Sequence, residues 1–281
     1  MQKQQAMFRD CWFLAGSVDA IGYSHSLNLG RLAVHRHLRE TYTASNTKFE
    51  SVAYQDVAGR QLDERKRLFD QAIRESCTVI VMATADLVGE EVMSYVEQFP
   101  NITFVGPWDS TFPPTQENIA TFHLNWFPAS FVAGAVAASV SKTCGGFLTT
   151  ISHQGAVDSS AWSNAMGFVL GYQWQESRTV NKEEDVTAQS NKTLHVVTME
   201  AAIQGQGQVQ AARLLIDQKG CDVIARHSER CDVDQYIGER SLATVVGNAP
   251  RLFSVAPYTD MASYAGDSVL TSQVRPFRCG T

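Results

Sequence analysis

The chain has 281 residues, a length that is too great for one ordinary hydrophobic core and predicts two α/β lobes with a cleft between them. Its 44% hydrophobic and 19% charged residues are ordinary for a soluble globular protein, and no apolar run approaches the roughly 20 residues of a membrane-spanning helix. A formal net charge of −6 weighs against a nucleic-acid surface, because phosphate binding needs a concentrated excess of Lys and Arg. We therefore expect the chain to bind a small molecule and not a nucleic acid.

Strand-like and helix-like segments alternate along the chain, which is the pattern of parallel sheets with crossover helices. The predicted strands are 11–16, 49–55, 78–82, 102–105, 146–151, 194–199, 222–225 and 242–246. The predicted helices are one that ends near 38, an amphipathic one around 68–73, and 88–98, 127–141, 161–174 and 207–218. Exposed loops are expected at 107–116, which contains Pro113-Pro114, and at 176–192, which is polar and charged.

This pattern predicts the α/β class, with two Rossmann-like lobes built on parallel sheets. The expected boundaries are 1–125 for an N-terminal lobe, 126–250 for a C-terminal lobe, and 251–281 for a segment that returns to the N-terminal lobe.

Ligands of open parallel sheets bind outside the carboxyl ends of the strands, where loops and helix N-termini converge. The residues just after the predicted strands are therefore the candidate binding residues: Asp19, Tyr23, Thr84, Asp86 and Trp108 in the first lobe, and His227, Glu229 and Asn248 in the second. Aromatic rings beside carboxylates and amides suit a flat heterocycle that carries hydroxyl groups. The alternatives are that Tyr23 and Trp108 simply pack in the core and that His227 is a hydrogen-bonded structural histidine.

Catalytic and metal-binding motifs were sought along the chain. There is no G-x-S-x-G elbow, no P-loop, no G-x-G-x-x-G after the first strand and no H-E-x-x-H. The six cysteines form no C-x-x-C pair, so the spacing of zinc ribbons and of thioredoxin chemistry is absent from the sequence. Their even number permits disulfides without proving them. We therefore expect no enzyme, no catalytic residue, no cofactor and no metal site. The alternative enzyme would be a hydrolase that uses Asp19 and Asp86, with clustered carboxylates of perturbed pKa.

Several segments share a collinear pattern: Gly22–Arg31, Glu97–Phe104, Phe131–Ala135, Ala211–Ala225, Arg226–Glu229 and Leu270–Ser272. In order, from about residue 11 to 274, the chain resembles the basic-membrane-protein (BMP) family of substrate-binding proteins, which includes purine nucleoside receptor lipoproteins. The resemblance implies a type I periplasmic-binding-protein fold that captures a purine nucleoside or a similar molecule between its lobes. It places Tyr23 beside the base and Asp86 and Asn248 near polar ligand groups.

The resemblance also implies a role in import through an ABC transporter or in signalling, with a membrane transporter or receptor as partner. It implies an extracellular or periplasmic, membrane-associated location. The N-terminus, Met-Gln-Lys-Gln-Gln, lacks the apolar core of a signal peptide, so the chain is cytosolic, already processed, or a domain of a larger protein. An intracellular ligand-responsive regulator stays an alternative, although the sequence offers no basic helix-turn-helix.

Overall fold

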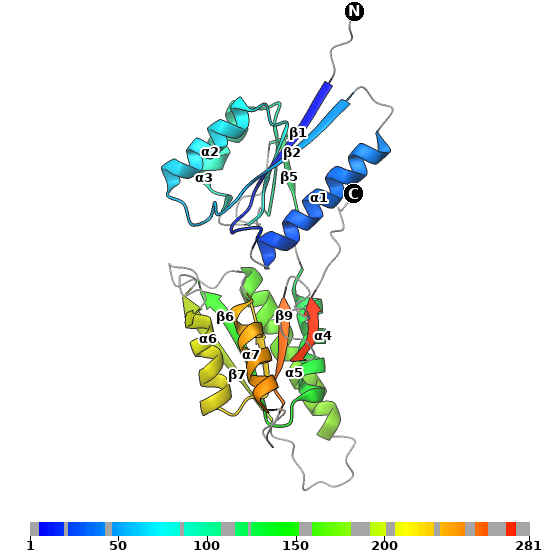
Figure 1. The fold of residues 1–281 in the computed structure, drawn as a ribbon, viewed down its shortest axis with the longest axis vertical. Coiled ribbons are helices and arrows are strands. Elements are labelled where there is room, and N and C mark those ends of the chain that lie inside the picture. The colour runs from blue at the N-terminus through cyan, green and yellow to red at the C-terminus, as the bar shows by residue number, and fades with distance from the viewer. Residues whose placement is uncertain are drawn as a thin grey trace, which may run out of the picture. The chain divides into compact units, whose positions relative to one another are not determined.

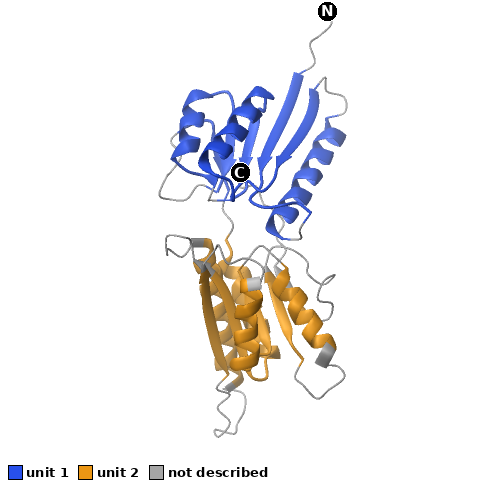
Figure 2. Cartoon of the chain, turned by 60° about the vertical axis from the view of Figure 1, so that its left-hand side comes forward, with its two compact units in different colours: residues 1–124, 277–281 blue, residues 125–276 orange. Residues whose placement is uncertain are grey.

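A computed structural model describes residues 6–19, 22–42, 47–84, 87–107, 116–122, 125–151, 159–180, 192–200, 206–227, 231–244, 251–257 and 268–273. The chain divides into two compact units, which Figure 2 colours separately: unit 1 is Met1–Leu124 with Phe277–Thr281, and unit 2 is Asn125–Pro276. Each unit is built on its own sheet with helices on both faces (Figure 1). None of the described helices combines the length and apolar character needed to cross a lipid bilayer.

The sheet of unit 1 has the strand order β2-β1-β3-β4-β5, with every neighbouring pair parallel. Its strands are β1 (Ala6–Phe13), β2 (Thr47–Tyr54), β3 (Val79–Met82), β4 (Thr103–Gly106) and β5 (Ile119–Thr121). The apolar run of β3 is mostly buried, as expected for a central strand that is covered on both faces.

Two helices, α2 (Leu62–Arg74) and α3 (Glu90–Gln98), pack on one face of this sheet. Phe69 and Ala72 of α2 lie at helical spacing and are buried against the strands. Helix α1 (Tyr23–Thr41) covers the other face, and its buried residues are Ser24 and Leu27 near its start.

The sheet of unit 2 has the order β10-β9-β8-β6-β7, again with parallel pairs. Its strands are β6 (Cys144–Ile151), β7 (Thr193–Glu200), β8 (Val223–Arg226), β9 (Phe253–Pro257) and β10 (Val269–Gln273). Helices α4 (Phe127–Val140) and α5 (Ser159–Val180) cover one face. The other face is covered by α6 (Gln206–Arg213), its π-helical continuation η2 (Leu214–Gln218) and α7 (Asp232–Thr244).

Each sheet carries a disulfide at the start of a central strand. Cys11 on β1 is bonded to Cys77, which precedes β3, and Cys144 on β6 is bonded to Cys221, which precedes β8. The residue before each second cysteine has a left-handed backbone, with φ 61° at Ser76 and φ 73° at Gly220. This conformation ends the preceding helical segment and turns the chain into the strand, and glycine adopts it without a steric penalty.

Three sequence predictions differ from the structure. A strand was expected at 242–246, but α7 is helical to Thr244, because Val233 and Ile237 lie one turn apart and pack in the core. Leu242, whose apolar character favoured a strand, is 74% exposed. The predicted loop at 176–192 begins inside α5, which continues to Val180.

The third difference concerns residues 251–281, which were expected to return to the N-terminal lobe. Instead β9 and β10 extend the second sheet, because β9 pairs with β8 and β10 pairs with β9, and of this segment only Phe277–Thr281 are grouped with unit 1. The predicted loop at 107–116 lies almost wholly outside the described residues. The two parallel-sheet α/β lobes themselves are confirmed.

Candidate functional site

The carboxyl edge of the first sheet is organised by the segment that follows β1. The N–H of Leu14 donates to the carbonyl of Tyr54 at 2.9 Å, and the N–H of Gly16 donates to the hydroxyl of Ser24 at 2.9 Å. The first bond ties the segment to β2 and the second ties it to the first turn of α1. The start of α1 is therefore held at the carboxyl end of β1, and no side chain caps its N-terminus.

Tyr23, the first residue of α1, is a predicted binding residue that the structure places at this edge. Its hydroxyl donates to the carbonyl of Ala83 at 2.8 Å, and its half-buried ring packs against Leu14, Leu27 and Ala83. The side chain thus connects α1 to the end of β3. Tyr23 has a packing role, and part of its ring stays accessible.

Thr84 directly follows Ala83, whose carbonyl accepts the hydrogen bond from Tyr23, and it therefore lies near Tyr23. Its Oγ1 is buried and has no hydrogen-bond partner among the described residues. An unpaired buried hydroxyl costs free energy, so Thr84 offers a hydrogen bond that a ligand or a water could satisfy. Asp19 is exposed on the segment after β1, and its N–H donates to the Ser17 hydroxyl at 3.1 Å.

In unit 2 the predicted residue His227 directly follows β8 and is only 6% exposed. Its Nδ1 lies 2.7 Å from the side-chain amide nitrogen of Asn164 on α5, whose Oδ1 accepts from the hydroxyl of Ser130 on α4. Ser130, Asn164 and His227 therefore form one hydrogen-bonded chain that connects α4 and α5 to the end of β8.

Two further residues belong to this polar cluster. Trp126, which precedes α4, meets the His227 ring edge to face with centroids 6.3 Å apart. Thr149 of β6 lies on the same sheet face as His227. Phe147 stands two positions before Thr149, Ala225 stands two positions before His227, and both pack in the α4–α5 core. Side chains two positions apart on a strand point to the same face. The Oγ1 of Thr149 is buried and has no hydrogen-bond partner among the described residues.

Arg226, next to His227, faces the opposite side of the sheet. Its guanidinium pairs with the carboxylate of Asp234 on α7, with Nε 2.9 Å from Oδ2 and side chains 1% and 0% exposed. Since Asp234 neutralises this buried cation, Arg226 is not positioned as an anion-binding group.

Four predicted site residues, Asp86, Trp108, Glu229 and Asn248, lie outside the described residues. Sequence reasoning missed a set of residues that the structure adds to the carboxyl edge of the second sheet: Trp126, Ser130, Thr149 and Asn164. The signal for Asn164 and Ser130 was a polar residue on the inner face of an otherwise apolar helix.

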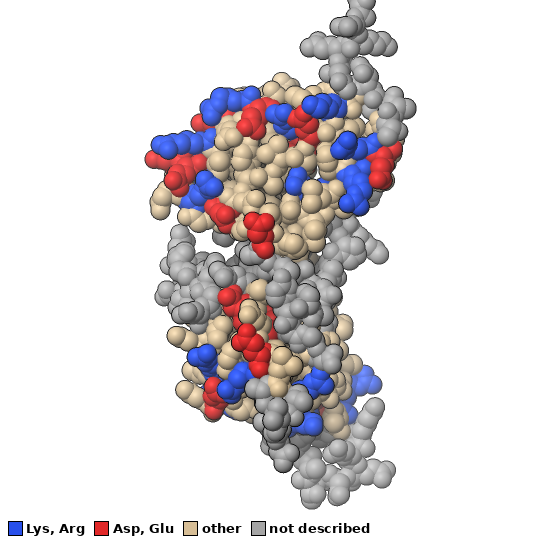
Figure 3. Space-filling model, viewed as in Figure 1, with Lys and Arg blue, Asp and Glu red and all other residues tan. Residues whose placement is uncertain are grey.

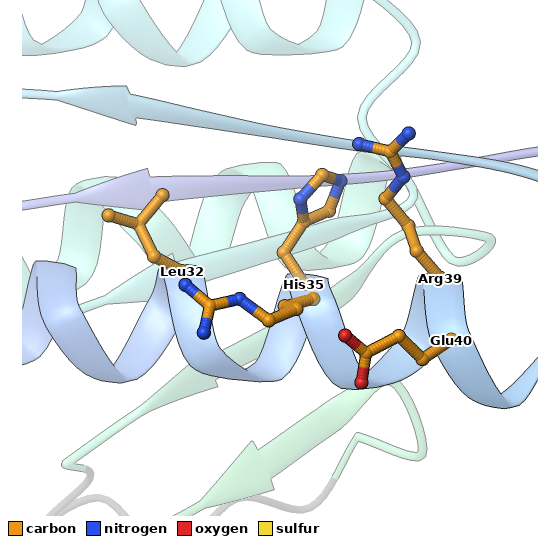
Figure 4. A pocket seen from close by; sticks show the side chains of 5 residues that line it. Leu32, His35, Arg39 and Glu40 are labelled. Carbon is orange, nitrogen blue, oxygen red and sulfur yellow. The ribbon is translucent and has the colours of Figure 1, made fainter.

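A depression of about 510 Å³ lies elsewhere, along the second half of α1. Leu32, His35, Arg36, Arg39 and Glu40, all on this one helix, line it, and Figure 4 shows Leu32, His35 and Arg39 on the same side of the helix. The His35 ring already makes a contact within unit 1, because its Nε2 lies 3.1 Å from the carbonyl oxygen of Phe49 on β2. The depression is distant from the carboxyl edge and has no convergent polar groups from other elements.

The shifted pKa values near these edges do not indicate an acid–base pair. Burial, followed by the neighbouring Asp232, raises the pKa of the Cys231 thiol, which keeps it protonated and unreactive. Away from the edges, burial and the hydrogen bond to Asp70 raise the pKa of Tyr95 to about 12. On the face shown in Figure 3, the basic and acidic side chains of unit 1 are interspersed, and no basic face is formed.

The sequence matches no protein-family model and no curated protein. Solved structures are similar in fold. A solute-binding protein of an ABC transporter system from Aeropyrum pernix K1 is 12% identical with a TM-score of 0.69, covering 95% of this chain and 66% of that protein. The chain thus spans about two thirds of that protein's length.

Two further structures have the same fold. A sugar transporter protein from Clostridium phytofermentans is 13% identical with a TM-score of 0.56, covering 92% of this chain and 83% of that one. The Cra transcriptional regulator from Pseudomonas putida, in complex with fructose 1-phosphate, is 15% identical with a TM-score of 0.54, covering 90% and 79%. The fold is therefore the two-lobed α/β architecture of type I periplasmic binding proteins.

Proposed function

We propose that this chain is a non-enzymatic binding protein that captures a small polar molecule of the nucleoside class at the carboxyl edges of its sheets. The observation that carries the proposal is a pair of buried hydroxyl groups, Thr84 Oγ1 and Thr149 Oγ1, that have no partner among the described residues. Both stand at a carboxyl edge, where ligands of parallel sheets bind. At either edge, a ligand that carries hydroxyl groups would supply the missing partner of that threonine.

The neighbouring groups support a neutral, hydroxyl-bearing ligand. His227 presents an imidazole ring held by Asn164, and Tyr23 presents an aromatic face at the carboxyl edge of unit 1. Arg226 is neutralised by Asp234, so among the described residues at this edge it does not offer a free cation to a phosphate. The resemblance to nucleoside-binding proteins of the BMP family favours a purine nucleoside over a sugar.

Import through an ABC transporter, or signalling through a receptor, is the proposed context, with the chain outside the cytoplasm. The two disulfides support this location, because such bonds persist in oxidising compartments. The solved transcriptional regulators of the same fold keep an intracellular regulator as the second candidate. Thiol titration of the chain isolated from its source separates them, because a cytoplasmic regulator would have free thiols at Cys11 and Cys77.

A thermal-shift screen with nucleosides, bases and sugars tests the proposed function, because a bound ligand raises the melting temperature in proportion to saturation. Product analysis of the same samples reports any turnover. A shift with purine nucleosides and no product is expected. A shift with sugars alone would assign a different ligand class, and product formation would contradict a pure binding role.

Valine variants of the two threonines sharpen the screen. Thr84→Val and Thr149→Val keep the side-chain shape and remove the unpaired hydroxyl, so each should leave the ligand-free protein equally or more stable while weakening binding by about 1 kcal/mol, roughly fivefold. Ser254→Ala is the matched control, because Ser254 Oγ is also buried without a described partner but lies at the amino end of β9. Its affinity should equal that of the wild type.

A further inference from the structure

A second cluster of reactive side chains lies at the amino edge of the sheet in unit 2. Cys144 is the first residue of β6, His195 is on the edge strand β7, and Cys221 lies two residues before the start of β8. Cys144 and His195 share a sheet face, because His195 pairs with Gly146 and strand side chains alternate. The three residues therefore converge from three separate elements, far from the carboxyl edge.

The ligating atoms of these three residues all lie within 4.8 Å of one another. Both cysteines are buried, and His195 is half-buried on the exposed side of the cluster. The cysteines form a cystine in the structure. The Cys11–Cys77 cystine of unit 1 has no comparable third ligand among the described residues.

Two thiolates and one imidazole are a ligand set that Zn²⁺ prefers, with a tetrahedral arrangement whose fourth position can be filled by water or a carbonyl oxygen. The carbonyl oxygen of Lys219 lies 3.4 Å from Cys144 Sγ and is positioned for that role. Two thiolates also cancel the charge of the ion, so a buried site needs no further counter-charge. We propose that Cys144, His195 and Cys221 form a redox-gated metal site, which is a cystine when oxidised and binds zinc when reduced.

The two states are connected by thiol–disulfide exchange with a dithiol reductant. The Cys144–Cys221 bond breaks and its sulfurs take up two electrons and two protons, while the reductant closes its own disulfide. Zinc then binds as both thiols release their protons to solvent and His195 binds through a neutral ring nitrogen. The disulfide links the start of β6 to the segment before β8, and the metal would link the same two positions and also β7.

Cobalt(II) serves as the spectroscopic probe, with the full chain in the background Cys11→Ser, Cys77→Ser. The protein is reduced with a phosphine, freed of reductant without air, and titrated first with Co²⁺ and then with Zn²⁺. We expect a thiolate-to-cobalt charge-transfer band with tetrahedral ligand-field bands, saturating at one ion per chain and displaced by Zn²⁺. The oxidised protein should give no band.

His195→Gln separates a ligand from a neighbour, since it leaves both cysteines in place. The affinity for Co²⁺ should fall by at least about tenfold, the lower limit of what even an outer-shell partner of a metal contributes. The oxidised variant should keep the wild-type melting temperature. A reduced chain with titratable thiols but no charge-transfer band, or an affinity unchanged in His195→Gln, would overturn the proposal.

Discussion

The sheets of the two units have the same strand order, but the helices on one face of each sheet are attached differently: α1 in unit 1, and α4 with α5 in unit 2. In unit 1, α1 buries only Ser24 and Leu27 and reaches the edge strand β2 through polar contacts, such as Arg31 to Ser51 and His35 to Phe49. In unit 2, α4 buries five residues, and Gly134 and Gly171 allow α4 and α5 to approach at backbone distance. Helix α1 of unit 1 is thus attached largely through polar contacts, whereas α4 and α5 of unit 2 pack closely against each other.

The comparison extends to charge. Arg226 and Asp234 of unit 2 form a fully buried ion pair, whereas Arg9 and Glu50 of unit 1 form a pair with side chains 20% and 23% exposed. Solvent screens the second pair and not the first. The consequence is that unit 2 should be the more sensitive of the two to single substitutions.

The largest expected effect follows from breaking the buried pair. Asp234→Ala leaves the Arg226 cation uncompensated and should destabilise unit 2 by about 3–5 kcal/mol. Glu50→Gln in unit 1 should have a far smaller effect, because solvent screens the Arg9–Glu50 pair and exposed pairs contribute little. Urea unfolding followed by hydrogen exchange in each unit measures both, and similar losses in the two variants would refute the contrast.

Removing either disulfide should have a comparable effect in its own unit. The bonds close segments with sequence separations of 66 and 77 residues, so the loss of loop-closure entropy in the unfolded chain is nearly the same. Cys11→Ala with Cys77→Ala, and Cys144→Ala with Cys221→Ala, should each cost about 2–4 kcal/mol. Hydrogen exchange should rise in the unit that lost its bond. A loss confined to one of the two double variants would show that the bonds are not equivalent.

The close approach of α4 and α5 predicts an effect of intermediate size. A Cβ on Gly171 would lie 1.9 Å from the carbonyl oxygen of Phe131, so Gly171→Ala forces the helices apart and should cost about 1–3 kcal/mol. Gly59→Ala in unit 1 is the control, because a Cβ there meets nothing within 4 Å. Thermal unfolding compares them, and equal melting temperatures would mean that the helices do not pack this closely.

The smallest effect concerns Tyr23, where packing and the proposed ligand contact can be separated. Tyr23→Phe loses the hydrogen bond to Ala83 and should cost about 1 kcal/mol of stability while it keeps a ring for stacking. Tyr23→Ala should also weaken ligand binding by about 1–3 kcal/mol, as loss of one base–aromatic stack does. Calorimetry with and without ligand separates the loss of stability from the loss of affinity. Unchanged affinity in Tyr23→Ala would remove this ring from the proposed site.

The candidate site could be predicted only in part. The position of Tyr23, Thr84 and His227 at a carboxyl edge could be predicted, because residues that follow the strands of a parallel sheet reach that edge; their role in binding stays a prediction. Asn164 and Ser130 were missed, because they stand in the middle of helices and become neighbours of His227 only when α4 and α5 pack together. No spacing along the chain encodes that meeting.

The sequence by itself determined the α/β class and most of the strands, because short apolar runs such as Val79–Met82 and helical spacing such as Phe69 with Ala72 depend on local pattern alone. Only the tertiary structure decided that 232–244 is a helix, because Val233 and Ile237 pack in a core with residues far along the chain, such as Leu148 of β6. It also decided the cysteine pairs, since the strand order places Cys11 beside Cys77 and Cys144 beside Cys221. Local propensity specifies elements, whereas contacts between distant residues select which sheet they join and which side chains meet.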